Sequence, residues 1–182
     1  NDGVSASVEG GSFGSFGAKV TYGDLIFSLN LDQPILSLDE LAERADKLLP
    51  DFCKLPISML YPTGKKQADI EPTPLTDKYY QDAEIIAGDF LFIRRHLPDR
   101  LEGKTIITNT VTSKDLDELR KRGVTYLVTT TPEFNGRSFG TNVMEAVMLA
   151  ILGKKWEEVE PQDYLNLIKR LEFKPRVVKL QD

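Results

Sequence analysis

The residues of this 182-residue chain best suited to bind an anion lie in a loop between an apolar segment and a helical one. Residues 136–141 contain glycine, serine, threonine and Arg137, and they lead directly into apolar residues at helical spacing. Free backbone N–H groups and the positive end of a helix dipole favour an anion there. A guanidinium can bind phosphate or carboxylate through two hydrogen bonds. The residues predicted to bind the anion or substrate are Thr131, Arg137, Ser138, Thr141 and Asn142.

The same loop also has a simpler interpretation. Gly136 and Gly140 would make a tight turn, Thr141 would cap the helix, and Arg137 would be solvated. Both interpretations stay open, because strand–loop–helix units are common and most of them bind nothing.

A second glycine-rich segment, near the N-terminus, has the order of a dinucleotide-binding unit. It lies between two expected strands, 4–8 and 18–23, and the second strand leads to Asp24. The spacing is too short for a parallel crossover, which needs a dozen or more residues. Either the unit is no βαβ unit or, as we prefer, residues near 11–17 are absent from the sequence, together with an N-terminal part. The predicted cofactor-binding residues are Gly10, Gly11, Gly14, Asp24, Asn109 and Thr110.

The acid in this unit predicts a cofactor preference. Asp24 at the end of a strand would accept hydrogen bonds from ribose hydroxyls and repel a 2′-phosphate. NAD would then bind more tightly than NADP, and Asp24→Ala would narrow the difference.

Strands and helices alternate along the rest of the chain, which predicts an α/β fold. Further strands are expected at 83–88, 104–108 and 124–130. One helix starts at the capping box of Ser37 and Glu40 and ends before Pro50. The expected architecture is one Rossmann-like, doubly wound domain over 1–182, with a mainly parallel sheet and helices on both faces. Residues 50–82 form a proline-rich, irregular insertion.

Helical spacing marks the helix that follows the anion loop. Its apolar residues fall at i, i+3, i+4, i+7 and i+8, and they are Val143, Ala146, Val147, Ala150 and Ile151. A capped helix is expected from Thr112 and Asp115 to Gly123, and a last helix begins at Pro161.

Composition excludes several classes of function. The net charge of −5 makes a nucleic-acid partner unlikely, and no apolar segment is long enough to span a membrane. A single cysteine, Cys53, and no signal peptide favour a cytoplasmic protein with no Cys-rich metal site. His96, the single histidine, lies at an expected helix end. The expected partner is a small-molecule ligand, and a homo-oligomer stays open.

With these residues in view, the chain resembles a bacterial family named as quinate 5-dehydrogenases, related by name to the shikimate dehydrogenases. The matching stretches are 20–27, 60–67, 86–90, 92–95, 108–110, 129–132 and 136–142. The resemblance implies a Rossmann-like domain, NAD or NADP as cofactor, and a hydroxy-acid substrate like quinate or shikimate. Shikimate-type dehydrogenases use a Lys/Asp pair for proton transfer, and this chain offers no match for it, so no catalytic residue is assigned.

Two hypotheses about function therefore remain. The first is an NAD(P)-dependent oxidoreductase that acts on a quinate- or shikimate-like hydroxy acid. The second is a Rossmann-like protein that binds a nucleotide or metabolite without catalysis.

Overall fold

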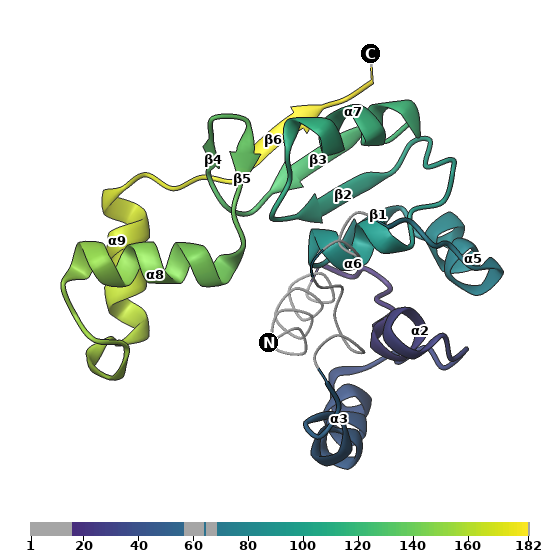
Figure 1. Ribbon diagram of the computed structural model, residues 1–182, viewed down its shortest axis with the longest axis horizontal. Helices are drawn as coiled ribbons and strands as arrows, with labels where there is room; N and C mark the ends of the chain where they lie inside the picture. The colour runs from purple at the N-terminus through teal and green to yellow at the C-terminus, as the bar shows by residue number, and fades with distance from the viewer. Residues whose placement is uncertain (1–15, 57–63, 65–68, 182) are drawn as a thin grey trace. The chain divides into compact units, whose positions relative to one another are not determined.

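The computed structural model describes residues 16–56, 64 and 69–181, and it has an α/β architecture (Figure 1). Its contacts divide the chain into two compact units, residues 1–101 and 102–182, which are described in turn. The predicted strand 4–8 and the glycines Gly10, Gly11 and Gly14 lie outside the described residues. So does most of the segment near 11–17, of which only residues 16 and 17 are described, as a turn.

The first unit is mainly helical. Its apolar core contains Tyr22, Leu25, Ile35 and Leu41. Backbone hydrogen bonds of 2.8 and 3.3 Å join Tyr22 and Ile35 across this core. The described elements are α2 (Asp24–Leu29), α3 (Leu38–Phe52), α5 (Pro74–Asp82), β1 (Ile85–Ala87) and α6 (Phe90–Arg95).

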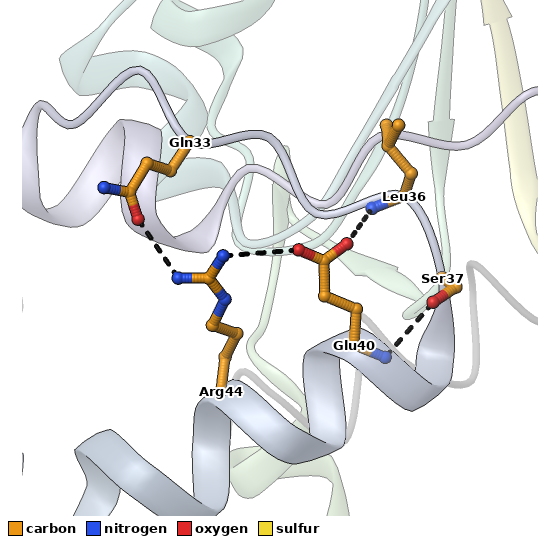
Figure 2. A network of polar contacts seen from close by, with 5 residues as sticks. All are labelled: Gln33, Leu36, Ser37, Glu40 and Arg44. Atoms are coloured by element: carbon orange, nitrogen blue, oxygen red, sulfur yellow. Dashed lines mark hydrogen bonds and ion pairs between the residues drawn. The ribbon is translucent and has the colours of Figure 1, made fainter.

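A polar network fixes the start of α3 (Figure 2). The Ser37 hydroxyl accepts from the Glu40 N–H at 3.1 Å, which confirms Ser37 as the predicted N-cap. The Glu40 carboxylate accepts from the Leu36 N–H at 3.2 Å and lies 3.5 Å from Arg44, which also donates to Gln33. Reciprocal contacts of this kind satisfy backbone donors that a helix start leaves free.

Two boundaries in this unit differ from the prediction. Helix α3 continues through Pro50 to Phe52, so the proline lies inside the helix, where it cannot donate a hydrogen bond to the preceding turn. The proline-rich segment 50–82 is not irregular throughout, since 74–82 form α5. Thr73 and Thr76 make a capping box at its start, and Pro74 occupies the first turn, where its missing N–H costs nothing.

The strand expected over 18–23 is also wrong. These residues contain a single bridge, from Tyr22 to Ile35, and the chain then turns into α2. Asp24 accordingly lies in the first turn of a helix rather than at the end of a strand. An acid in that position is favoured by the helix dipole, which gives Asp24 a structural reason independent of any cofactor.

The second unit contains the βαβ element that positions the candidate site. Strands β2 (Thr105–Thr108) and β3 (Tyr126–Thr129) are parallel, and α7 (Ser113–Lys121) connects them. β6 (Arg176–Lys179) pairs antiparallel with β3, so the sheet is mixed, with the order β2-β3-β6. The predicted strands β2 and β3 and the predicted cap of Thr112 and Asp115 on α7 are confirmed, whereas a doubly wound, Rossmann-like arrangement stays a prediction.

Between β3 and β6 the chain forms a hairpin and two helices. The hairpin consists of β4 (Glu133–Phe134) and β5 (Arg137–Ser138), and the helices are α8 (Thr141–Leu152) and α9 (Pro161–Arg170), with a short 3₁₀ turn, η2 (Trp156–Glu158), between them. α8 and α9 pack on each other and extend away from the sheet (Figure 1).

The apolar residues at helical spacing on α8 include three that are exposed to solvent. Val143, Val147 and Ile151 are 48%, 41% and 45% exposed, whereas Met144 on another side of the helix is buried. Helical spacing identified the apolar stripe correctly, but α9 packs against a different part of a helix that is apolar nearly all round.

The single histidine is part of the first unit's interior. His96 follows α6 as its C-cap, which confirms its predicted position at a helix end, and its ring lies 5.5 Å from that of Phe27. Neither ring nitrogen has a hydrogen-bond partner among the described residues. Burial, and secondarily the charge of Arg95, lower the pKa of His96, while backbone groups of Phe27 and Glu71 act in the opposite direction.

We expect the stability of the chain to fall as the pH drops below 6.5, the ordinary pKa of histidine. The folded state holds His96 neutral, so the unfolded state binds more protons and gains from acidification. Urea unfolding at pH values from about 8 to about 5.5 measures the free energy of unfolding. This window lies above the range in which most carboxylates titrate. His96→Phe should flatten the curve in that window, and parallel curves for the two proteins would contradict the assignment.

Candidate functional site

The candidate site lies at the carboxyl edge of β2 and β3, within the second unit. Three segments meet there: 109–112 after β2, 130–132 after β3, and 137–141, which leads into α8. The Thr130 N–H and hydroxyl both donate to the Thr108 carbonyl, at 2.9 and 3.3 Å. Ligands of parallel α/β sheets bind outside this edge, so these three segments form the candidate site.

The hairpin in front of α8 is built on an Asn-Gly turn. Asn135 and Gly136 both have positive φ, 51° and 80°, which is the geometry of a type I′ turn. Phe134 and Arg137 are paired across it. The Asn-Gly dipeptide predicts such a hairpin, whereas the small and polar residues after it indicate only a loop.

Two residues predicted to bind the anion instead hold the hairpin in place. The buried Ser138 hydroxyl accepts from the Val111 N–H at 2.8 Å, and the Ser138 N–H donates to the Val111 carbonyl at 2.9 Å. The Thr131 hydroxyl donates to the Phe139 carbonyl at 2.6 Å. Both hydroxyls are therefore engaged within the protein, and their contribution to a site is to fix its shape.

Thr110 and Gly140 approach each other closely at the same edge. A Cβ atom on Gly140 would lie 3.3 Å from the Thr110 hydroxyl oxygen, which favours glycine there. Thr110 itself has φ 45°, a left-handed conformation that is rare for a β-branched residue. Backbone strain of this kind costs about 1–3 kcal/mol and concentrates at functional sites.

The N-terminus of α8 is uncapped by any side chain. Gly140 takes the N-cap position, so Thr141, expected as a cap, lies instead in the first turn and is exposed, as is Asn142. No acidic residue lies in this turn to balance the helix dipole. The predicted helix therefore starts beside Thr110 with no acid in its first turn, and an anion bound there stays a prediction.

Arg137 is the cation nearest in sequence to this helix start. It is exposed, and its guanidinium carbon lies 5.4 Å from the centre of the Phe139 ring. Within the described ranges it makes no ion pair. The neighbouring acid, Glu133, pairs with Arg176 and accepts from the Gly136 N–H, so its charge is already balanced.

Two buried polar atoms at the strand ends have no hydrogen-bond partner among the described residues. They are Oδ1 of Asn109 and the hydroxyl of Thr129, a residue that is 2% exposed. An unsatisfied buried polar atom costs about 1–3 kcal/mol, and each such atom calls for an explanation. The sequence does not predict that these two atoms are buried, because the pattern of polar and apolar residues does not show which polar side chains lose contact with water.

The structure thus brings together the segments that contain Asn109, Thr110, Thr131, Arg137, Ser138, Thr141 and Asn142. Asp24 belongs to the first unit, and the predicted glycines of the cofactor turn lie outside the described residues. Within 16–56, 64 and 69–181, no group of three or more His, Cys, Asp or Glu residues is placed to hold a metal ion. No helix in those ranges is both long enough and apolar enough to cross a membrane.

We expect Ser138→Ala to lower the free energy of unfolding by about 1–3 kcal/mol, because it leaves the Val111 N–H unsatisfied in a buried position. Ser113→Ala is the matched control. Its hydroxyl donates to the Gly136 carbonyl from an exposed position, so its loss should cost less than about 0.5 kcal/mol. Urea unfolding measures both, and an equal effect of the two changes would argue against the role assigned to Ser138.

The chain belongs to a family described as a domain of unknown function, DUF8754, whose model matches residues 10–180. No curated protein and no solved structure gives a significant match. The family description carries no activity, so the dehydrogenase expected from the resemblance stays a prediction.

Proposed function

We propose that this member of the DUF8754 family binds a small molecule with a carboxylate or phosphate group at the carboxyl edge of β2 and β3. One observation carries the proposal. Arg137 is exposed and held over the Phe139 ring, with no ion pair among the described residues, in the loop that leads to the uncapped start of α8. A cation and a helix N-terminus favour the same kind of ligand group.

The surroundings of Arg137 favour a role in ligand binding over that of an ordinary solvated surface residue. Contact with Phe139 restricts the guanidinium, so less side-chain freedom is lost when a ligand binds. The Glu133–Arg176 pair removes the acid that could otherwise neutralise Arg137. A hydrogen bond to a charged group contributes about 1.5–3 kcal/mol, which corresponds to roughly ten- to hundredfold in affinity.

The buried polar atoms suggest what the rest of the ligand carries. Oδ1 of Asn109 can accept a hydrogen bond, and the Thr129 hydroxyl can donate or accept one. Hydroxyl groups on the ligand would satisfy both atoms. A hydroxy acid, or a nucleotide with its sugar, combines hydroxyl groups with an anionic group and fits this pattern. The strained Thr110 lies in the same segment as Asn109.

Oxidation of a quinate- or shikimate-like hydroxy acid with NAD or NADP is a second candidate, and the same orphaned acceptor of Asn109 favours it. Here Asn109 and Thr110 would contact the cofactor. The acids nearest the strand ends are already engaged, Glu133 in an ion pair and Asp115 in the cap of α7. Because these contacts leave no acid–base pair to assign, we prefer binding without catalysis.

The test is calorimetric titration of the full chain with quinate, shikimate, inorganic phosphate, NAD and NADP at fixed ionic strength. Arg137→Ala should weaken binding of the recognised ligand by about ten- to hundredfold. Arg137→Lys should restore only part of the affinity if the guanidinium binds through two hydrogen bonds. Neither change should affect the free energy of unfolding by more than about 0.5 kcal/mol, because the side chain is exposed.

Arg170→Ala provides the matched control, since Arg170 is an exposed arginine in the last turn of α9. Loss of binding in Arg137→Ala but not in Arg170→Ala would support the site. Equal binding by the unmodified chain, Arg137→Ala and Arg170→Ala would rule out Arg137 as the anion contact. Formation of NADH with quinate or shikimate would favour the second candidate over the first.

A further inference from the structure

The turn of the β4–β5 hairpin holds an asparagine whose side chain is free to react. Asn135 is exposed, and among the described residues its side-chain amide has no hydrogen-bond partner. Gly136 follows it and carries no side chain that could keep the backbone nitrogen away from the amide carbon of Asn135. An asparagine in this setting can cyclise with its own backbone.

The cyclisation needs water and no other reactant. The backbone nitrogen of Gly136 attacks Cγ of Asn135, so that a bond forms between these atoms and the bond from Cγ to Nδ2 breaks. Ammonia leaves with the proton that the backbone nitrogen loses. Water then opens the succinimide ring at either of its carbonyl carbons, and position 135 becomes aspartate or isoaspartate.

The hairpin restrains this reaction only weakly. The Gly136 N–H donates to the Glu133 carboxylate at 2.8 Å, and attack on Cγ requires a backbone rotation that gives up this exposed hydrogen bond. Each strand of the hairpin has two residues, and so short a hairpin opens locally at low cost. The buried hydrogen bonds between Ser138 and Val111 lie beyond the turn, so the turn can open while the base of the hairpin stays in place.

The other asparagines of the described ranges are less well placed to react. Each is followed by leucine, threonine or valine, whose side chain hinders the approach of the backbone nitrogen. Two of them lie in helices α8 and α9, and another accepts a hydrogen bond from the Thr73 hydroxyl at 3.0 Å. These asparagines are Asn30, Asn109, Asn142 and Asn166.

We propose that Asn135 is a site of spontaneous deamidation, and that the carboxylate formed there weakens anion binding at Arg137. The second part rests on the proposed function. Asp-Gly suits the same type I′ turn as Asn-Gly, because aspartate also tolerates the left-handed conformation that position 135 adopts. The aspartate product therefore keeps the hairpin and adds a negative charge two residues before the guanidinium, where it competes with an anionic ligand.

Peptide mapping by mass spectrometry tests the modification. The full chain is incubated at mildly alkaline pH, and the peptide that contains Asn135 should lose its unmodified form faster than the peptides of Asn30, Asn109, Asn142 and Asn166. Asn135→Gly is the matched control, because Gly-Gly also suits a type I′ turn and has no side-chain amide to lose. If Asn135 stays intact while the other asparagines react, the proposal is wrong.

Calorimetric titration tests the consequence for Arg137, with the same compounds as for the proposed function. Asn135→Asp should weaken anion binding by about two- to fivefold, whereas Asn135→Gly should leave it unchanged. In an Arg137→Ala background, Asn135→Asp should have no further effect. Equal affinity of Asn135→Asp and the unmodified chain would contradict the competition. Absence of binding by the unmodified chain would refute the proposed function and the competition together, whereas the peptide map decides the deamidation independently.

Discussion

The pair of hydrogen bonds between Ser138 and Val111 is the contact on which the architecture of the second unit depends. It joins the hairpin to the segment after β2, so it fixes where Arg137 lies and where α8 begins. The Thr131–Phe139 hydrogen bond adds a second tie, from the segment after β3. A short polar hairpin has little apolar surface of its own, and such buried hydrogen bonds replace the core it lacks.

Local signals predicted the βαβ element well. The cap of Thr112 and Asp115, the β-branched strands and Gly123 after α7 each depend on residues close in sequence. The position of Asp24 could not be obtained in this way, because an acid suits a helix start and a ribose equally well. Val143, Val147 and Ile151 show the other limit: periodicity identifies an apolar face, but tertiary contacts decide what covers it.

The sequence predicts the candidate site as a set of converging donors, and the structure brings together the segments that carry them. Sequence order placed Asn109, Thr110 and Arg137 near strand ends, and the parallel β2–β3 pair brings those ends together. The roles of Ser138 and Thr131 could not be predicted, because a serine or threonine hydroxyl that braces a backbone has the same sequence signature as one that binds a ligand. The hairpin, by contrast, can be predicted, because the Asn-Gly pair at 135–136 favours a two-residue β-turn.

The position of α8 and α9 in the chain has a consequence for how the protein is made. β6 pairs with β3, yet β5, α8 and α9 separate the two strands, so a ribosome delivers β3 well before its antiparallel neighbour. Until β6 is synthesised, the backbone N–H and C=O groups along one edge of β3 are unpaired. The nascent chain must therefore complete the whole insertion before β6 can pair with β3, and until then this edge can pair with a strand of another chain.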